Sequence, residues 1–198
     1  MITIIDYKSG NLKSIRNGFL KIGYEVEITD DIETIANANH LVLPGVGVFG
    51  SIMENVKPFQ NVISEYINDD KPFLGICSGL QVLFSESEES PDIKGLNIFK
   101  GKVKKIPEGR KIPHMGWNKI SLTKNSLILD ETMNNEYFYF VHSYYADAED
   151  NVISSTTDYG LDLPASVELN NCFATQFHPE KSGAVGLKIL KNFSKISL

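Results

Sequence analysis

The sequence predicts an α/β fold with a mostly parallel central sheet flanked by helices and with antiparallel additions. In the first half of the chain, short apolar runs alternate with segments whose apolar residues recur at helical spacing. This pattern is typical of parallel strands joined by right-handed crossovers. In the second half, strand-like runs separated by Gly, Pro, Asn and Asp indicate further strands. Because no composition break, low-complexity tract or repeat divides the chain, we expect one domain over residues 1–198.

Strands and helices alternate in the first half. Asn11 is a potential N-cap for the first helix, and Gly23 should end that helix. Pro58 should interrupt the helical stretch after the third strand. The predicted strands are residues 2–6, 24–29, 40–45 and 72–76, and the predicted helices are residues 12–22, 32–38, 49–56, 59–67 and 80–84.

The second half is predicted to be richer in strands. Its final element should be an amphipathic helix over residues 184–196, with Leu187, Leu190 and Phe193 as an inner row. The predicted strands are residues 101–106, 119–122, 137–145, 151–157, 165–169 and 173–177.

Composition and charge exclude several classes of function. A net charge of −6 argues against non-specific binding to nucleic acid or to a membrane surface. The opening apolar run stops at Asp6, and no run approaches the roughly 18 apolar residues of a membrane helix, so we expect a cytoplasmic protein. The two cysteines form no disulfide framework, and the four histidines lack zinc-ligand spacing. No metal or other cofactor is therefore expected.

The segment Gly75-Ile-Cys77-Ser-Gly79 has the form G-x-C-x-G between an apolar strand and a helical run. This is the arrangement of a nucleophile elbow, in which flanking glycines relieve crowding at a strained turn. The helix N-terminus would favour a thiolate at Cys77. The residue would also lie at the carboxyl ends of the strands, where open α/β sheets bind ligands. Cys77 is therefore the predicted nucleophile, with a buried cysteine in a turn as the alternative. Cys172 starts a strand without glycines and is predicted to be a small buried residue.

The segment Phe177-His178-Pro179-Glu180 follows a predicted strand. In an extended chain, residues two apart face the same side, so the His178 and Glu180 side chains should meet. By itself the segment is more typical of a surface turn. Combined with a cysteine elbow, it predicts a triad of nucleophile, base and orienting carboxylate formed by Cys77, His178 and Glu180.

These motifs and others resemble the class I glutamine amidotransferases, which have a flavodoxin-like α/β fold. The matching segments are residues 6–12, 43–49, 75–84, 113–118, 139–144 and 176–183. The chain is most similar to the branch whose glutaminase subunit pairs with a (β/α)₈-barrel synthase subunit in histidine biosynthesis. Close paralogues that supply ammonia to sugar-modifying barrels in surface glycan pathways have nearly the same motifs, so this alternative stays open. Ser78 stands where we expect an aliphatic residue in most relatives.

The resemblance implies glutamine as substrate and assigns roles to further residues. The backbone N–H groups of Val46 and Ser78 would form the oxyanion hole, and glycines 45 and 47 would let the loop peptide turn over when the partner binds. Glutamine would contact Gly47, Gln81, His142, Ser143 and Tyr144. The barrel would dock against Asn11, Met115, Trp117, Asn118 and Lys181.

Some interpretations from the residues alone compete with these roles. Trp117 in a glycine-flanked loop is typical of an interface anchor, and a core tryptophan is an equal alternative. His142 on an aromatic strand is more often a core histidine. The run of Glu86, Glu88 and Glu89 is predicted to be a solvated turn. A stand-alone thiol hydrolase and a catalytically inactive scaffold that binds a barrel are the rival hypotheses for the whole chain.

Overall fold

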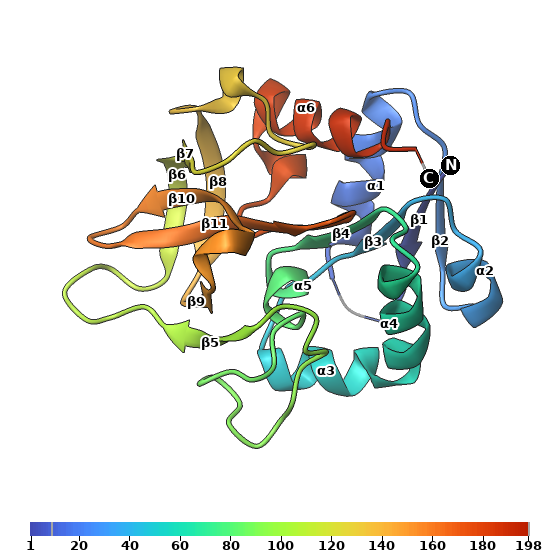
Figure 1. Ribbon diagram of the computed structural model, residues 1–198, viewed down its shortest axis with the longest axis horizontal. Coiled ribbons are helices and arrows are strands. Elements are labelled where there is room, and N and C mark those ends of the chain that lie inside the picture. The colour runs from blue at the N-terminus through green and yellow to red at the C-terminus, as the bar shows by residue number, and fades with distance from the viewer. Residues whose placement is uncertain (9, 198) are drawn as a thin grey trace.

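The computed structural model describes residues 1–8 and 10–197 (Figure 1). The strands are β1 (Ile2–Ile5), β2 (Val26–Thr29), β3 (Leu41–Leu43), β4 (Phe73–Ile76), β5 (Gly101–Lys105), β6 (His114–Lys119), β7 (Ser121–Leu122), β8 (Tyr137–His142), β9 (Tyr144–Ala148), β10 (Ile153–Asp158), β11 (Asp162–Leu169) and β12 (Cys172–Thr175). The α-helices are α1 (Leu12–Lys21), α2 (Ile32–Ala36), α3 (Phe49–Val56), α4 (Gln60–Asn68), α5 (Ser78–Gln81) and α6 (Gly183–Phe193). Short 3₁₀ turns are η1 (Lys57–Phe59), η2 (Glu131–Met133), η3 (Asp150–Val152) and η4 (Pro179–Lys181).

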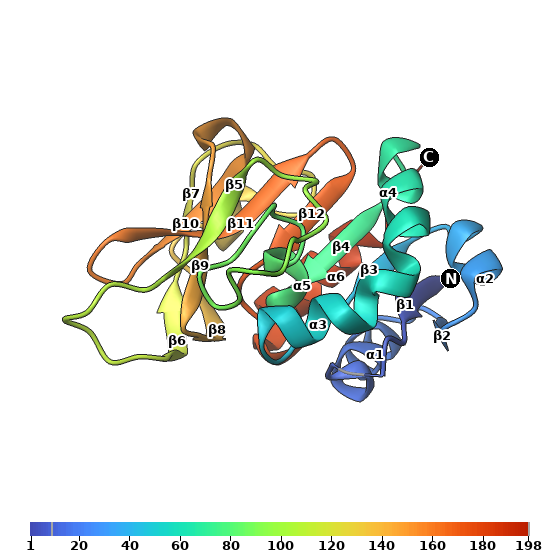
Figure 2. The same ribbon diagram turned by 90° about the horizontal axis from the view of Figure 1, so that it is seen from below.

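An eight-stranded sheet runs through the molecule in the order β2-β1-β3-β4-β12-β11-β10-β7. Its strands pair in parallel from β2 to β12, and β11, β10 and β7 extend it in antiparallel fashion. Two small antiparallel pairs, β5 with β9 and β6 with β8, lie beside this extension (Figure 2). The predicted fold class, a mostly parallel sheet with antiparallel additions, is confirmed.

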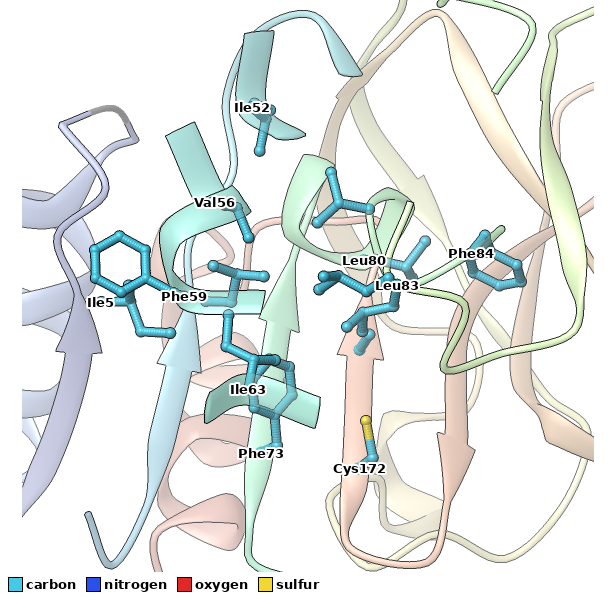
Figure 3. Close-up of a cluster of buried hydrophobic side chains, with 14 of the residues drawn as sticks. Ile5, Ile52, Val56, Phe59, Ile63, Phe73, Leu80, Leu83, Phe84 and Cys172 are labelled. Carbon is cyan, nitrogen blue, oxygen red and sulfur yellow. The ribbon is translucent and has the colours of Figure 1, made fainter. Parts of the chain in front are cut away.

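Helices cover both faces of the parallel strands, with α1 and α6 on one face and α3 and α4 on the other (Figures 1 and 2). Strand β3 is wholly apolar because both of its faces are covered. Leu41 and Leu43 pack into the cluster that contains α3 and α4, whereas Val42 packs into the cluster that contains α1 and α6. The first cluster includes Cys172, which is buried as predicted, with 3% of it exposed (Figure 3). Burial raises the pKa of its thiol.

Two predicted elements of the first half differ in detail from the structure. The helix predicted over residues 80–84 is instead α5, which begins at Ser78 and ends at Gln81. The carbonyls of Val82 and Leu83 accept hydrogen bonds from Leu96 and Ile98, so a returning segment replaces the next helical turn. Asn11 occupies the N-cap position of α1, but its side chain makes no capping hydrogen bond.

In the second half, the predicted strand over residues 137–145 is broken at Ser143. Strand β8 before the break pairs with β6, and β9 after it pairs with β5, so the chain changes sheets at this residue. The segment around Trp117 was predicted to be a loop and is strand β6, whose Gly116 has a φ of +134°. The strand prediction over residues 119–122 therefore covers only the end of β6 together with β7.

Other boundaries differ by a few residues, as at the ends of α2, α6 and β12. Pro58 interrupts the helical stretch as predicted, because it lies in η1 between α3 and α4. None of the helices in the described part of the chain is long and apolar enough to cross a bilayer.

Candidate active site

Cys77 is the residue at which β4 turns into α5. Its φ of 56° and ψ of −112° place it in a backbone conformation that residues with a Cβ rarely adopt. Its N–H donates to the Thr175 carbonyl of β12 at 2.7 Å, which ties the turn to the neighbouring parallel strand. A strained residue between a buried strand and a helix start is the elbow geometry that the G-x-C-x-G pattern predicts.

The glycines of the elbow allow its backbone to pack against the neighbouring strand. A Cβ added at Gly79 would lie 2.2 Å from the Leu43 carbonyl oxygen. We therefore expect Gly79→Ala to lower the free energy of unfolding by at least about 3 kcal/mol, since a rigid backbone atom must move. Thermal or denaturant unfolding would measure this. Gly50→Ala is the matched control, because its new Cβ meets the movable Ser90 hydroxyl at 2.8 Å. Equal stabilities for the two variants would contradict this account of the elbow.

His178 and Glu180 form a buried pair. The Nδ1 atom of His178 lies 2.9 Å from Oε1 of Glu180, and their side chains are 1% and 0% exposed. The contact agrees with the sequence prediction, but the extended backbone from which it was predicted is not present. Glu180 lies in the 3₁₀ turn η4 rather than in extended chain, and the turn brings its carboxylate back to the imidazole.

The surroundings of His178 favour its protonated form. Burial alone lowers the pKa of His178, but the neighbouring Cys77 sulfur and the hydrogen-bonded Glu180 carboxylate outweigh burial and raise this pKa to about 9. The Nε2 atom has no hydrogen-bond partner within normal length among the described residues. The protonated ring therefore has the Nε2–H left to donate.

Cys77 and His178 line one pocket of about 320 Å³. Every residue predicted to form the oxyanion hole or to contact glutamine lines it too. Glu180 does not line the pocket and lies behind His178. The lining residues are Val46, Gly47, Cys77, Ser78, Gln81, Glu89, Pro113, Val141, His142, Ser143, Tyr144 and His178.

The loop after β3 packs directly against the elbow and lines the pocket beside it. Gly47 has a φ of +118°, the left-handed region that favours glycine. Gly45 is needed for a different reason, because a Cβ there would lie 2.0 Å from the Gly79 nitrogen. The Ser78 hydroxyl donates to the Gly47 carbonyl at 3.2 Å. Ser78, the departure noted in the sequence, thus ties the elbow to this loop through its side chain.

Glu89 lies in a turn as predicted, but it is half-buried and lines the pocket, which the sequence prediction does not anticipate. Its Oε2 accepts a hydrogen bond from the Phe49 N–H at 2.7 Å, at the start of α3. Glu88 is exposed as predicted. An acidic run is usually solvated, and nothing in the local pattern distinguishes these two carboxylates. Only the packing of this segment against α3 does so.

Gln176 is a second residue without a predicted role. Its Nε2 lies 3.8 Å from the Cys77 sulfur, and its Oε1 accepts a hydrogen bond from Gln81 Nε2 at 3.1 Å. Gln81 also donates to the Tyr144 carbonyl at 2.9 Å. The two glutamine side chains thus connect Cys77 to the strand break at Ser143.

Most of the predicted interface residues lie near one another. Met115 and Trp117 are 58% and 55% exposed on β6, which excludes a core position for Trp117. Trp117 contacts the Tyr139 ring at 6.2 Å between centroids, and the Lys181 Nζ lies 5.7 Å from the same ring. Asn118 is half-buried, with its amide bonded internally. Among the described residues, no hydrogen bond joins Asn11 to this group.

Comparison with known proteins identifies relatives over nearly the whole chain. The family model described as glutamine amidotransferase class-I matches residues 3–196. The chain is 53% identical over 196 residues to the imidazole glycerol phosphate synthase subunit HisH of Methanothermobacter thermautotrophicus, covering 99% of this chain and 98% of that protein. It is 47% identical over 196 residues to the subunit of the same name from Methanocaldococcus jannaschii, covering 99% and 100%.

Solved structures of low sequence identity share the fold. One described as a glutamine amidotransferase superposes with a TM-score of 0.77 at 16% identity, covering 98% of each chain. PurLQS from Thermotoga maritima superposes with a TM-score of 0.77 at 18% identity, covering 98% of this chain and 96% of that one. With a family model that spans almost all of its residues and with HisH relatives of this identity, the chain belongs to the class I glutamine amidotransferase family.

Proposed function

We propose that this chain is a glutaminase subunit, which hydrolyses glutamine and passes the ammonia to a synthase partner that makes imidazole glycerol phosphate in histidine biosynthesis. The observation that carries the proposal is one pocket in which Cys77 faces an imidazole backed by a buried carboxylate at 2.9 Å. The names of the relatives support the histidine pathway over the sugar-modifying alternative. As an enzyme of amino-acid biosynthesis, it would act in the cytoplasm.

In the proposed reaction, Cys77, His178 and Glu180 act as a catalytic triad. The Cys77 thiolate attacks the side-chain carbonyl carbon of glutamine and forms a C–S bond. The C–N bond then breaks, and the departing nitrogen leaves as ammonia with the proton of His178 Nε2. Water gives a proton to the now neutral His178 and attacks the glutamyl thioester, and the C–S bond breaks. This step releases glutamate and restores the Cys77 thiolate and the protonated His178. Glu180 keeps the imidazole oriented and stabilises its protonated form.

The oxyanion of each tetrahedral intermediate would be held by backbone N–H groups. Ser78 is the first residue of α5, and the first N–H groups of a helix have no partner within the helix. Val46 would supply the second donor from the loop that packs against the elbow. Because backbone donors are fixed before charge develops, loss of one costs about 10²–10³-fold in rate. A turn of the loop peptide on partner binding would switch this donor on.

Glutamine would lie with its side-chain amide at Cys77 and its charged end toward Glu89. The walls beside it are Gly47, Gln81 and the segment 142–144. The Glu89 carboxylate lines the pocket, whereas the Glu180 carboxylate lies behind His178. A carboxylate in that position suits the α-ammonium group of the substrate.

We therefore expect Glu89→Gln to raise the KM for glutamine about ten- to a hundredfold, the effect of losing a charge-assisted hydrogen bond, with kcat little changed. The glutamine side chain keeps an acceptor for the Phe49 N–H, so the start of α3 should remain intact. Steady-state glutamate release measures both constants. Glu88→Gln, in the same turn but outside the pocket, is the matched control. An unchanged KM in Glu89→Gln would remove this residue from the binding site.

The partner would be a (β/α)₈-barrel subunit in a heterodimer. Met115, Trp117 and Lys181 form the exposed group on which we propose that it docks, and exposed Trp side chains are typical anchors. Asn11 and Asn118 are proposed to lie at the edge of this contact. Lyase chemistry, with formation of aminoimidazole carboxamide ribotide beside imidazole glycerol phosphate, would take place in the barrel and not in this chain.

The test is glutamate release by the chain alone, with an imidazole glycerol phosphate synthase barrel, and with that barrel plus its nucleotide ligand. A steep rise with the liganded barrel supports the proposal. Labelling of Cys77 by a glutamine-directed affinity reagent without stimulation by this barrel would retain the triad and exclude the histidine partner. Hydrolysis of simple esters but not of glutamine would favour a stand-alone thiol hydrolase. Absence of both activity and labelling would favour an inactive scaffold.

A further inference from the structure

A buried chain of hydrogen bonds runs behind the pocket wall formed by residues 142–144. His114 of β6 lies directly opposite His142 of β8 in the strand pairing, and the two side chains belong to residues only 3% and 6% exposed. The Nδ1 atom of His114 lies 3.0 Å from Nε2 of His142. His142 lines the pocket, and His114 lies one residue after the pocket residue Pro113.

Asn118 determines which atom donates in each hydrogen bond of this buried series. Its Oδ1 accepts from the Lys119 N–H at 2.8 Å, and its Nδ2 donates to the Asp158 carbonyl at 2.8 Å, so the two ends of the amide are identified. The same Nδ2 lies 3.3 Å from His114 Nε2. This nitrogen must therefore be an acceptor, which places the proton of a neutral His114 on Nδ1.

His142 then has only one compatible tautomer. Because His114 Nδ1 donates, His142 Nε2 must accept, and the proton of His142 lies on Nδ1. That N–H donates to the Tyr144 carbonyl at 2.8 Å. Gln81 Nε2 donates to the same carbonyl at 2.9 Å. The backbone where the chain leaves β8 for β9 is thus held by two donors, one from each side of the pocket.

The surroundings keep both rings neutral and in place. The His114 ring stacks between Phe140, at 4.8 Å between centroids, and Tyr159, at 4.0 Å. Burial lowers the pKa of His114 to about 4. Burial lowers the pKa of His142 to about 3, although the hydrogen bond to the Tyr144 carbonyl acts in the opposite direction. Two neutral imidazoles in a row leave no unmatched donor.

We propose that His114 is a positioning residue for glutamine binding: it holds His142 in the Nδ1–H tautomer, so that His142 clamps the Tyr144 carbonyl and keeps the adjoining pocket wall in its binding shape. The inference rests on the proposed glutaminase function for its kinetic consequence only. The tautomer assignment concerns the isolated chain and does not depend on catalysis.

The test is His114→Phe, which keeps a ring between Phe140 and Tyr159 and removes both hydrogen bonds. We expect the KM for glutamine of the complex with the barrel to rise about tenfold, the effect of an unmade buried hydrogen bond, with a smaller change in kcat. Nitrogen chemical shifts of the isotope-labelled isolated chain should show His142 leaving the pure Nδ1–H tautomer. Asn118→Ala, read by the same spectra, should loosen both tautomers even if His114→Phe folds poorly.

Tyr159→Phe is the control, because it keeps the stacked ring and removes only the hydroxyl bonded to the Lys111 carbonyl. It should leave the KM and the His142 spectrum unchanged. If His142 stays in the Nδ1–H tautomer in both His114→Phe and Asn118→Ala, the proposal is overturned, whatever happens to the KM. If the tautomer changes and the KM does not, the positioning role is overturned. If the wild-type complex itself releases no glutamate, the proposed function fails, while the spectra still decide the tautomer assignment.

Discussion

Replacing Cys77 with alanine is expected to lower glutamate release by the complex by more than about a thousandfold. The sulfur is the protein atom that forms the covalent bond to the substrate carbon in the proposed reaction, and loss of a nucleophile leaves only the effects of binding and of the oxyanion hole. Because the alanine retains the backbone of the elbow, the complex with the barrel should still form. Enzyme-coupled detection of glutamate, together with size-exclusion chromatography of the complex, measures both expectations.

The second cysteine provides the matched control. Cys172 is buried in the cluster with α3 and α4 and does not line the pocket. Cys172→Ala should keep its kcat and KM and lose some stability through the space left in the core. A glutamine-directed affinity label should modify the wild-type chain and Cys172→Ala but not Cys77→Ala. Full activity in Cys77→Ala would eliminate the thioester mechanism.

Glu180→Gln is expected to lower kcat by about 10²–10⁴-fold while leaving the KM for glutamine nearly unchanged. The carboxylate contacts His178 from the side away from the pocket, so its loss removes orientation and charge without removing a substrate contact. An amide can also present its N–H₂ group to Nδ1 and impose the wrong tautomer. Comparable losses in kcat and in substrate binding would instead indicate that the pocket has collapsed.

The pH dependence of the same pair provides a further measurement of this prediction. The pKa of His178 is raised to about 9, so the imidazole keeps its proton at neutral pH, and activity should fall on the alkaline side as pH rises through about 9. The stabilising contribution of this pair follows the same sign: it is fully present below the ordinary histidine pKa of 6.5 and is lost as pH rises through the folded-state pKa of about 9. In Glu180→Gln, the alkaline fall in activity and the alkaline loss of stability should both move to lower pH. If either stays at its wild-type pH, Glu180 is excluded as the partner that raises the pKa of His178.

The sequence by itself predicts the sheet-and-helix architecture and the sharp turn at Cys77. Short-range patterns determine these features: an apolar run such as the one before Cys77 must be buried on both faces, and glycines on either side of a polar residue permit a sharp turn. The contact between His178 and Glu180 is local as well, and it is predicted correctly although the turn that makes it is not. The strand around Trp117 is missed because Gly116 looks like a turn residue.

Only the tertiary structure decides which distant residues meet at the site. Glu89 and Glu88 are equivalent in the local pattern, and the packing of their segment against α3 selects one of them to line the pocket. His114 and His142 are brought opposite each other by the pairing of β6 with β8. The protonation pattern of these two rings depends on burial and on a hydrogen-bond chain that begins at Asn118. Such properties arise from long-range contacts and desolvation, which spacing along the chain does not encode.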